Sequence, residues 1–197
     1  HYGEKMNKAE ACAALGLDGK KRYMLFFGLV RAYKGLDLLL DAFGQVKEQL
    51  SDLQLIVAGE FYEDEDKYKE QIARNGLTDR VIVKNEFVAD ADLRKYFGAA
   101  DLIVQPYKTA TQSGVTQVAF HFEKPCLVTN VGGLGEIIHD GKMGYAVVPQ
   151  ADAIAKALVD YYENERQEAF TKYLIKEKEL YGWDKMTGVI LSLEFRV

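Results

Sequence analysis

The sequence predicts an α/β fold, in which a parallel sheet of about six strands carries helices on both faces. Six short apolar runs, rich in β-branched and aromatic residues, are typical of strands buried on both sides. These runs alternate with amphipathic segments of helical length, and such alternation favours right-handed crossovers onto one sheet. The chain has 197 residues, 48% of them hydrophobic, so it is large enough for one domain with a full core.

Each strand is expected at one apolar run. The first run, YMLFF, ends just before Gly28, and a later run, LIVA, ends just before Gly59. The six expected strands cover residues 23–27, 55–58, 81–83, 102–104, 126–129 and 145–148.

The expected helices follow from apolar spacing and from capping residues. Four apolar residues between positions 36 and 43 lie at i, i+3, i+4 and i+7, which is one face of a helix. A charged segment ends at Asn75-Gly76, a common C-terminal cap, and Asp90 is expected to cap the next helix. The helices are expected to start near residue 35 and to cover 65–74, 90–96, 113–123 and 151–162, with a helical tail over 165–197 that breaks near 182–183.

Charge and hydropathy exclude two classes of protein. Lys and Arg number 25 against 30 Asp and Glu, giving a formal net charge of −5, and no basic run is present. A nucleic-acid partner is therefore not expected. No apolar stretch of eighteen residues and no signal peptide are visible, so a membrane-spanning helix is not expected either.

The cysteines and histidines predict neither a disulfide framework nor a metal site. Cys12 and Cys126 are far apart and form no CxxC pair, so we expect free thiols in a reducing, cytoplasmic compartment, with Cys126 in a core strand. No His, Cys and Asp cluster has metal-ligand spacing. His121 is expected to be a packed helix residue rather than a ligand.

Two cations follow the first strand, where packing requires neither. Ligands of parallel sheets bind at the carboxyl ends of the strands. Gly28 allows a close approach of backbone there, and Arg31 and Lys34 lie just before a helix N-terminus. Their charges repel the positive end of the helix dipole unless an anion lies between them. The alternative is a solvated loop with ordinary surface charges.

Three further loops reach the same edge of the sheet. Gly59 is expected to open space after the second strand, and Ser113 and Gly114 offer N–H groups at a helix N-terminus. The alternative for Ser113 is a plain N-cap. Three glycines at 132, 133 and 135 precede Glu136, whose carboxylate could meet sugar hydroxyls or simply favour a helix start.

These residues match an ordered set of family motifs that spans roughly residues 23–158. Gly28, Arg31, Lys34 and Gly35 match G-x-x-R-x-x-K-G. Other matches are Val57-Ala58-Gly59, Phe87-Val88, Ala99-Ala100-Asp101 with Val104 and Pro106, Lys124-Pro125 through Gly132-Gly133 to Glu136, and Asp140-Gly141 with Gly144. The chain thus resembles the C-terminal, donor-binding domain of GT-B glycosyltransferases, in particular the retaining family 4 (glycosyl transferases group 1).

The resemblance implies a Rossmann-like, three-layer domain that forms one half of a GT-B fold. It implies that Arg31 and Lys34 hold the diphosphate of a nucleotide-sugar and stabilise it as it leaves, without a metal or cofactor. Phe87 and Val88 would border the nucleobase. The residues expected to meet phosphate and sugar are Gln112, Ser113, Gly114, Val115 and Thr116, with Glu136 further along the edge.

One departure from the family pattern concerns carboxylates. The family usually carries E-x7-E, but alignment on Pro125 places Ala110 and Val118 at the two Glu positions. The ribose carboxylate and a sugar-binding carboxylate are therefore absent. Gln112 or Gln117 could replace them as hydrogen-bonding partners.

The resemblance also carries expectations about the rest of the enzyme. Because the chain starts HYGEKMNKAE, without an initiator Met, we interpret residues 1–197 as one nucleotide-sugar-binding domain from the C-terminal half of a longer chain. The acceptor would be held by a missing N-terminal domain, without which the isolated chain is expected to be inactive. Polysaccharide or glycan biosynthesis at the inner membrane face, with peripheral membrane association, is expected on family grounds. Apolar residues of the tail are expected to be partly exposed: Val189, Ile190, Leu191, Leu193 and Phe195.

Two other classes of function compete with the enzyme. One is a non-catalytic nucleotide-binding module, or a sugar-nucleotide epimerase relative of the same fold, which the missing Glu pair favours. The other is a dinucleotide oxidoreductase, which the absence of G-x-G-x-x-G after the first strand disfavours. The pair Arg31 and Lys34 favours the glycosyltransferase, because leaving-group stabilisation requires cations.

Overall fold

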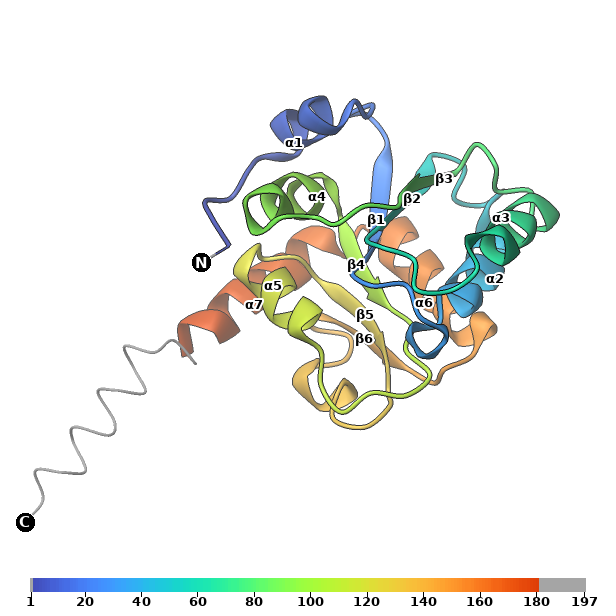
Figure 1. Ribbon diagram of the computed structural model, residues 1–197. Helices are drawn as coiled ribbons and strands as arrows, with labels where there is room; N and C mark the ends of the chain where they lie inside the picture. Colours follow the sequence, from blue (N-terminus) through green and yellow to red (C-terminus); the bar gives the residue numbers. More distant parts are fainter. Residues whose placement is uncertain (1, 181–197) are drawn as a thin grey trace, which may run out of the picture.

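The computed structural model, which describes residues 2–180, contains one parallel six-stranded sheet (Figure 1). The strands lie in the order β3-β2-β1-β4-β5-β6, and all neighbours pair in parallel. This confirms the predicted α/β, Rossmann-like class. The bounds are β1 (Arg22–Phe27), β2 (Leu53–Ala58), β3 (Val81–Lys84), β4 (Leu102–Gln105), β5 (Cys126–Thr129) and β6 (Gly144–Val147).

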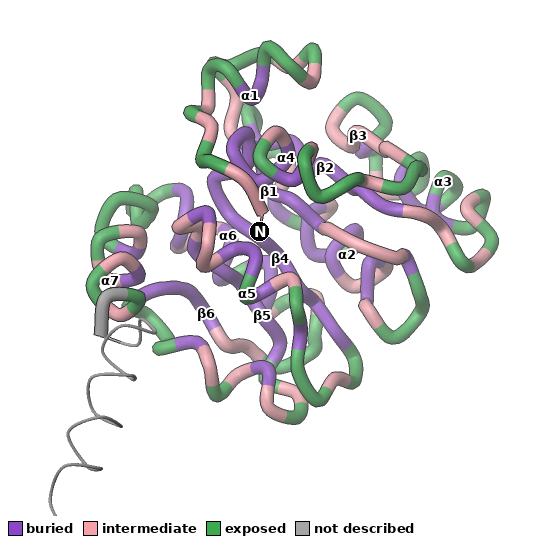
Figure 2. Tube along the Cα trace, turned by 60° about the vertical axis from the view of Figure 1, so that its left-hand side comes forward, coloured by how far each residue is buried: buried purple, intermediate pink, exposed green. Residues whose placement is uncertain are grey.

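Helices cover both faces of the sheet, and each face has its own core. The inner strands β1, β2, β4 and β5 are buried throughout most of their length, as Figure 2 shows, because alternate side chains pack against opposite layers. In β1, Met24 and Phe26 pack with α2 and α6, whereas Tyr23 and Leu25 pack with α1 and α4. The helices are α1 (Lys8–Leu15), α2 (Leu36–Val46), α3 (Glu65–Arg74), α4 (Leu93–Ala99), α5 (Gly114–His121), α6 (Ala151–Glu163) and α7 (Gln167–Leu180).

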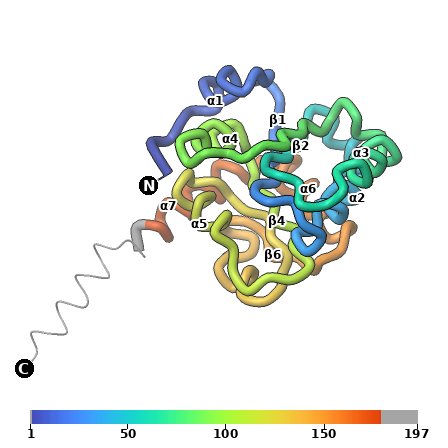
Figure 3. Tube along the Cα trace, in the orientation of Figure 1, coloured from blue at the N-terminus to red at the C-terminus, as the bar shows by residue number. Residues whose placement is uncertain are grey.

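Helix α1 was not predicted. It lies beside α4 (Figure 3) and its buried residues are only Ala11 and Cys12, so it has no wide apolar stripe. Local signals define its ends instead. The Asn7 side chain accepts a hydrogen bond from the Glu10 N–H, and Gly16 ends the helix in the left-handed conformation.

The helix expected over 90–96 is shifted. A 3₁₀ turn, Asp90–Asp92, comes first, and α4 follows as Leu93–Ala99. The expected cap is wrong, because the Asp90 side chain makes no hydrogen bond within the described residues. The predicted tail agrees with α7 as far as residue 180; the expected break near Gly182-Trp183 and the apolar residues at 189–195 lie outside the described residues.

Two smaller expectations, on the cysteines and on His121, are confirmed. Both Cys12 and Cys126 are buried and free. His121 is a packed helix residue: its Nε2 lies 3.0 Å from the Gly3 carbonyl oxygen and its ring meets the edge of Phe122. Within the described part of the chain, no helix is long and apolar enough to cross a membrane.

Candidate functional site

A cavity of about 720 Å³ opens at the carboxyl ends of β1 and β4. The order of the strands changes direction between these two strands, which is where ligands of open α/β sheets bind. Most of its wall comes from three regions of the chain: the end of β1 with the turn at Tyr33 and Lys34, the segment from Val88 to the start of α4, and the loop after β4 with the first part of α5. Tyr2, near the N-terminus, completes the wall.

Lys34 is the cation that lines the cavity. It lies in a 3₁₀ turn (Ala32–Lys34), which is fixed against the loop after β4. A Cβ on Gly35 would collide with the Pro106 carbonyl, and the Lys108 N–H donates to the Tyr33 carbonyl at 2.7 Å. This packing directs the ammonium back over the end of β1, where a Cβ on Gly28 would lie 3.0 Å from Nζ. Gly28, at φ +97°, therefore makes room for the lysine.

The Lys34 ammonium is half-buried and lacks an acidic partner. It lies 5.6 Å from the centre of the Tyr107 ring and makes no hydrogen bond or ion pair within residues 2–180. Burial, and then the nearby Arg31 guanidinium, lower the pKa of Lys34. A half-buried cation without an acidic partner among the described residues is suited to hold an anion.

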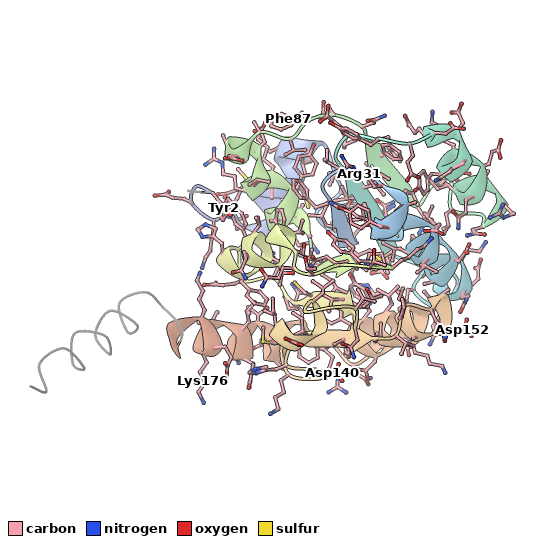
Figure 4. The ribbon with its side chains drawn as sticks, turned by 60° about the horizontal axis from the view of Figure 1, so that its bottom comes forward. Tyr2, Arg31, Phe87, Asp140, Asp152 and Lys176 are labelled. Atoms are coloured by element: carbon pink, nitrogen blue, oxygen red, sulfur yellow. The ribbon has the colours of Figure 1, made fainter. Side chains whose placement is uncertain are left out.

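Arg31 lies at the rim of the site rather than in the cavity wall. Its guanidinium stacks on the Tyr62 ring at 4.8 Å, and it too forms no ion pair within the described residues. Figure 4 shows Arg31 and Phe87 on the same side of the molecule. Since Tyr62 holds the guanidinium without neutralising it, the charge stays available to a bound anion.

The N-terminus of α5 adds backbone donors to the same cavity. The Ser113 hydroxyl caps the helix by accepting from the Val115 N–H at 3.2 Å, so the plain N-cap is present. Gln112, Gly114 and Val115 line the cavity as well, and the space beside Gly114 is open. A helix N-terminus next to a lysine is well suited to a phosphate group.

The remaining wall is aromatic and apolar. Burial raises the pKa of the Tyr107 hydroxyl to about 12, so it remains protonated, 3.4 Å from the Ser113 oxygen. Val88 lines the cavity, together with residues that were not among the expected site residues: Tyr2, Phe27, Tyr33, Asp90 and Leu93. Tyr2 carries no sequence signal, because it reaches the cavity only through the packing of the chain's first residues on His121.

Two predicted residues contribute to packing instead of to the cavity. Gly59 does not open space for a ligand: a Cβ there would collide with the Gly28 carbonyl, so the glycine permits close backbone contact between β1 and β2. Thr116 is fully buried, and its hydroxyl exchanges hydrogen bonds of 3.0 and 3.2 Å with the Gln105 side-chain amide. Neither lines the cavity.

Phe87 and Glu136 are also outside it. The Phe87 side chain is 75% exposed at the surface. Glu136 lines a second cavity of about 660 Å³ between α5 and α7, together with Gln117. The glycine-rich loop before Glu136 packs on the loop after β4, where a Cβ on Gly132 would collide with the Ala110 carbonyl.

The two positions that lack the expected glutamates do line the cavity. Val118 forms part of its apolar wall and Ala110 part of its polar loop. Among the described residues, no group of three or more His, Cys, Asp or Glu side chains is arranged to hold a metal ion.

Comparison with known proteins decides the family. Residues 7–177 match the family model of the glycosyl transferases group 1. The chain belongs to this family. A similar curated relative, 32% identical over 158 residues, is the lipopolysaccharide core biosynthesis mannosyltransferase LpsB of Rhizobium meliloti (strain 1021). The match covers 78% of this chain and 44% of the relative.

Solved structures of GT-B glycosyltransferases confirm the architecture of this group 1 chain. The C-terminal domain of a group 1 family protein, LpcC, from Francisella tularensis superposes with a TM-score of 0.78 at 21% identity, covering 91% of this chain and 95% of that one. HepE of Anabaena, solved with UDP, gives a TM-score of 0.77 at 21% identity over 98% of this chain and 54% of its own. At these identities the structures show the fold alone.

Proposed function

We propose that this chain binds the nucleotide-sugar donor of a retaining glycosyltransferase and stabilises the diphosphate that leaves. The observation that carries the proposal is the Lys34 ammonium, which is half-buried, without an acidic partner in the described residues, and set beside Gly28 and α5. The names of relatives support it: one curated relative is a mannosyltransferase, and HepE was solved with UDP, with UDP and glucose, and with UDP-glucose.

In this scheme the bond between the anomeric carbon and the phosphate oxygen breaks, and its electron pair stays on that oxygen. Lys34, Arg31 and the N–H groups at the start of α5 face the growing negative charge. The acceptor hydroxyl oxygen bonds to the anomeric carbon on the same face, and the leaving phosphate oxygen takes the hydroxyl proton. The chain therefore supplies positive charge instead of a general base. No metal is needed for this step in the proposal.

We further propose that the acceptor is held by another part of a longer, cytoplasmic enzyme that associates peripherally with the membrane. The chain spans 44% of the length of LpsB. In this proposal, residues beyond those described here hold the acceptor during sugar transfer. A transfer of sugar by the isolated chain is therefore not expected.

A second candidate is a nucleotide-binding module that transfers nothing. Val118 and Ala110 favour it, because both lie in the cavity wall at positions where the family usually has carboxylates. The two candidates differ in what a longer enzyme does with a bound donor: only the first releases the diphosphate when an acceptor is present.

Calorimetric titration of the chain with UDP, GDP and ADP and with their monophosphates tests the proposed site. One diphosphate is expected to bind roughly tenfold or more tightly than its monophosphate, because a second phosphate adds charge-assisted hydrogen bonds. Equal affinities for the two forms, or no binding of any nucleotide, would contradict the proposal.

The affinity for a diphosphate is expected to decline as the pH rises, and to do so below the range of an ordinary lysine. Burial and Arg31 lower the pKa of Lys34, so its ammonium loses the proton early and with it the attraction for phosphate. In Arg31→Ala, the Coulombic cause is removed and the decline is expected to move to higher pH. Titrations with ADP from about pH 7 to about pH 10.5 measure this, above the phosphate's own second pKa near 6. An unmoved midpoint would show that Arg31 does not act on Lys34.

A further inference from the structure

Asp90 places a carboxylate in the cavity wall, and the proposed binding of the diphosphate does not involve it. Of the described residues that line the cavity, it is the only acidic one, and Lys34 is the only basic one. Its side chain makes no hydrogen bond and no ion pair within residues 2–180, and it does not cap α4. It is exposed, so it is available to a ligand.

The surroundings of Asp90 differ from those of Lys34. Lys34 lies against Gly28, Tyr107 and the start of α5, where phosphate is expected. Asp90 lies between Val88 and Leu93 in the chain, both of them apolar residues of the same cavity wall, and no ion pair joins it to Lys34. The cavity therefore has a cationic part with backbone donors, and an apolar part with one free carboxylate.

A nucleotide has matching parts. Its phosphates suit the cationic part, and the flat faces of its base suit the apolar walls of Val88, Leu93 and Phe27. The edge of the base then meets a carboxylate, which accepts hydrogen bonds and donates none. The base that fits must present N–H groups, and two adjacent ones fit best because a carboxylate has two oxygens in one plane.

Only guanine among the common bases presents two adjacent donors, its N1–H and its 2-amino group. Uracil presents one N–H between two carbonyl oxygens, which a carboxylate repels. Adenine and cytosine present one amino group beside a ring nitrogen that accepts. We propose that Asp90 recognises the base of the donor nucleotide and selects guanine. This inference rests on the proposed function, since it assumes that the cavity holds a nucleotide.

The uridine of HepE does not decide the base for this chain. HepE is 21% identical, so the likeness shows that the two proteins share a fold and carries nothing about the residue at the base edge.

Calorimetric titration of the chain with GDP, UDP, ADP and xanthosine diphosphate tests the proposal. Wild type is expected to bind GDP roughly tenfold or more tightly than the other three. Asp90→Asn is expected to lose roughly 10- to 100-fold in GDP affinity and to gain affinity for xanthosine diphosphate. The reason is that an amide offers one donor and one acceptor, which match the 2-carbonyl and the N1–H of xanthine.

Asp92→Asn is the matched control. Asp92 belongs to the same 3₁₀ turn and the change removes the same charge, but its carboxylate pairs with Lys95 at 2.6 Å and lies outside the cavity wall. All four affinities are expected to stay as in wild type. Thermal unfolding of both variants shows whether each remains folded.

Other results would contradict either the role of Asp90 alone or the proposed nucleotide site as a whole. If wild type binds UDP or ADP as tightly as GDP, or if Asp90→Asn weakens all four nucleotides equally without a gain for xanthine, Asp90 does not recognise the base, and the proposed function stands. An equal loss of affinity for all four nucleotides would indicate that Asp90 contacts the ribose, which the four nucleotides have in common. If no nucleotide binds wild type, the proposed function falls and this inference with it.

Discussion

Replacing Lys34 by methionine is expected to remove most of the affinity for a nucleoside diphosphate while leaving the chain at least as stable as wild type. A charge-assisted hydrogen bond contributes about 1.5–3 kcal/mol, so affinity is expected to drop by roughly 10- to 100-fold. Arg31 stays in place at the rim and keeps part of the attraction. In Arg31→Ala/Lys34→Met both charges are absent, and a still larger loss is expected.

Lys34→Met is expected to weaken nucleotide binding but to stabilise the folded chain. The Lys34 ammonium is half-buried without an acidic partner in the described residues, and burial lowers its pKa, so folding of the free chain disfavours its charge. Methionine keeps the apolar stem without the charge, and the free energy of unfolding near pH 7 is expected to rise by roughly 0.5–2 kcal/mol. Because the folded pKa lies below the unfolded one, the penalty is fully present below the folded pKa. The difference from wild type should therefore shrink as the pH rises from the folded pKa to the unfolded pKa, and it should be absent above both values.

Urea unfolding at two pH values and calorimetry on the same samples measure both effects. Lys108→Met is the control: Lys108 also follows a strand end, but it pairs with Asp37 at 2.6 Å and does not line the main cavity. Its loss should leave nucleotide affinity unchanged. A Lys34→Met chain that binds as tightly as wild type, or unfolds more easily, would show that Lys34 is a packing residue.

Replacing Asp101 by alanine is expected to destabilise the fold by about 3–5 kcal/mol, a large part of a typical total of about 5–15 kcal/mol. The carboxylate is almost fully buried and accepts two hydrogen bonds of 2.7 Å from the Lys8 ammonium and one of 2.8 Å from the Tyr23 N–H. Alanine would leave the buried Tyr23 N–H unsatisfied and the Lys8 ammonium unpaired. It would also remove the ion pair that joins α1 to the sheet.

Urea unfolding of single and double variants at Lys8 and Asp101 gives the coupling between the two residues. The Lys172–Glu168 pair is a matched control, since its distance of 2.6 Å is similar but both side chains are largely exposed. Breaking that pair should produce no measurable change. An Asp101→Ala chain of wild-type stability would contradict the structural role. Nucleotide affinity of the folded fraction should not change, because Asp101 lies outside the cavity wall.

The motif match included Asp101 but did not show what this residue does. Ala99-Ala100-Asp101 belongs to a family pattern, and a charged residue in such a pattern could equally contact a ligand. The structure places it in the core, where it joins α1 to the sheet. Its partner Lys8 is 93 residues away in the chain, and no local pattern predicts a contact of that separation.

The sequence by itself determined the sheet, most helices, the family and the part of the site that follows local rules. Strands that are buried on both faces must be continuous apolar runs, and a half-buried helix must repeat its apolar residues every three or four positions. The cap at Ser113 and the cation Lys34 were predictable because each belongs to one short loop beside a helix start. Helix α1 was not predicted because its buried face consists only of Ala11 and Cys12.

Only the tertiary structure decided which edge residues meet in one cavity. A glycine in a sequence indicates that something approaches its backbone closely, but not what. At Gly28 the neighbour is the Lys34 ammonium, whereas at Gly59 it is the backbone of Gly28 itself. Asp90 was expected to cap a helix, and the shift of α4 to Leu93 leaves its carboxylate free beside the cavity. These roles depend on the positions of segments far apart in the chain, which are set by the packing of the whole sheet.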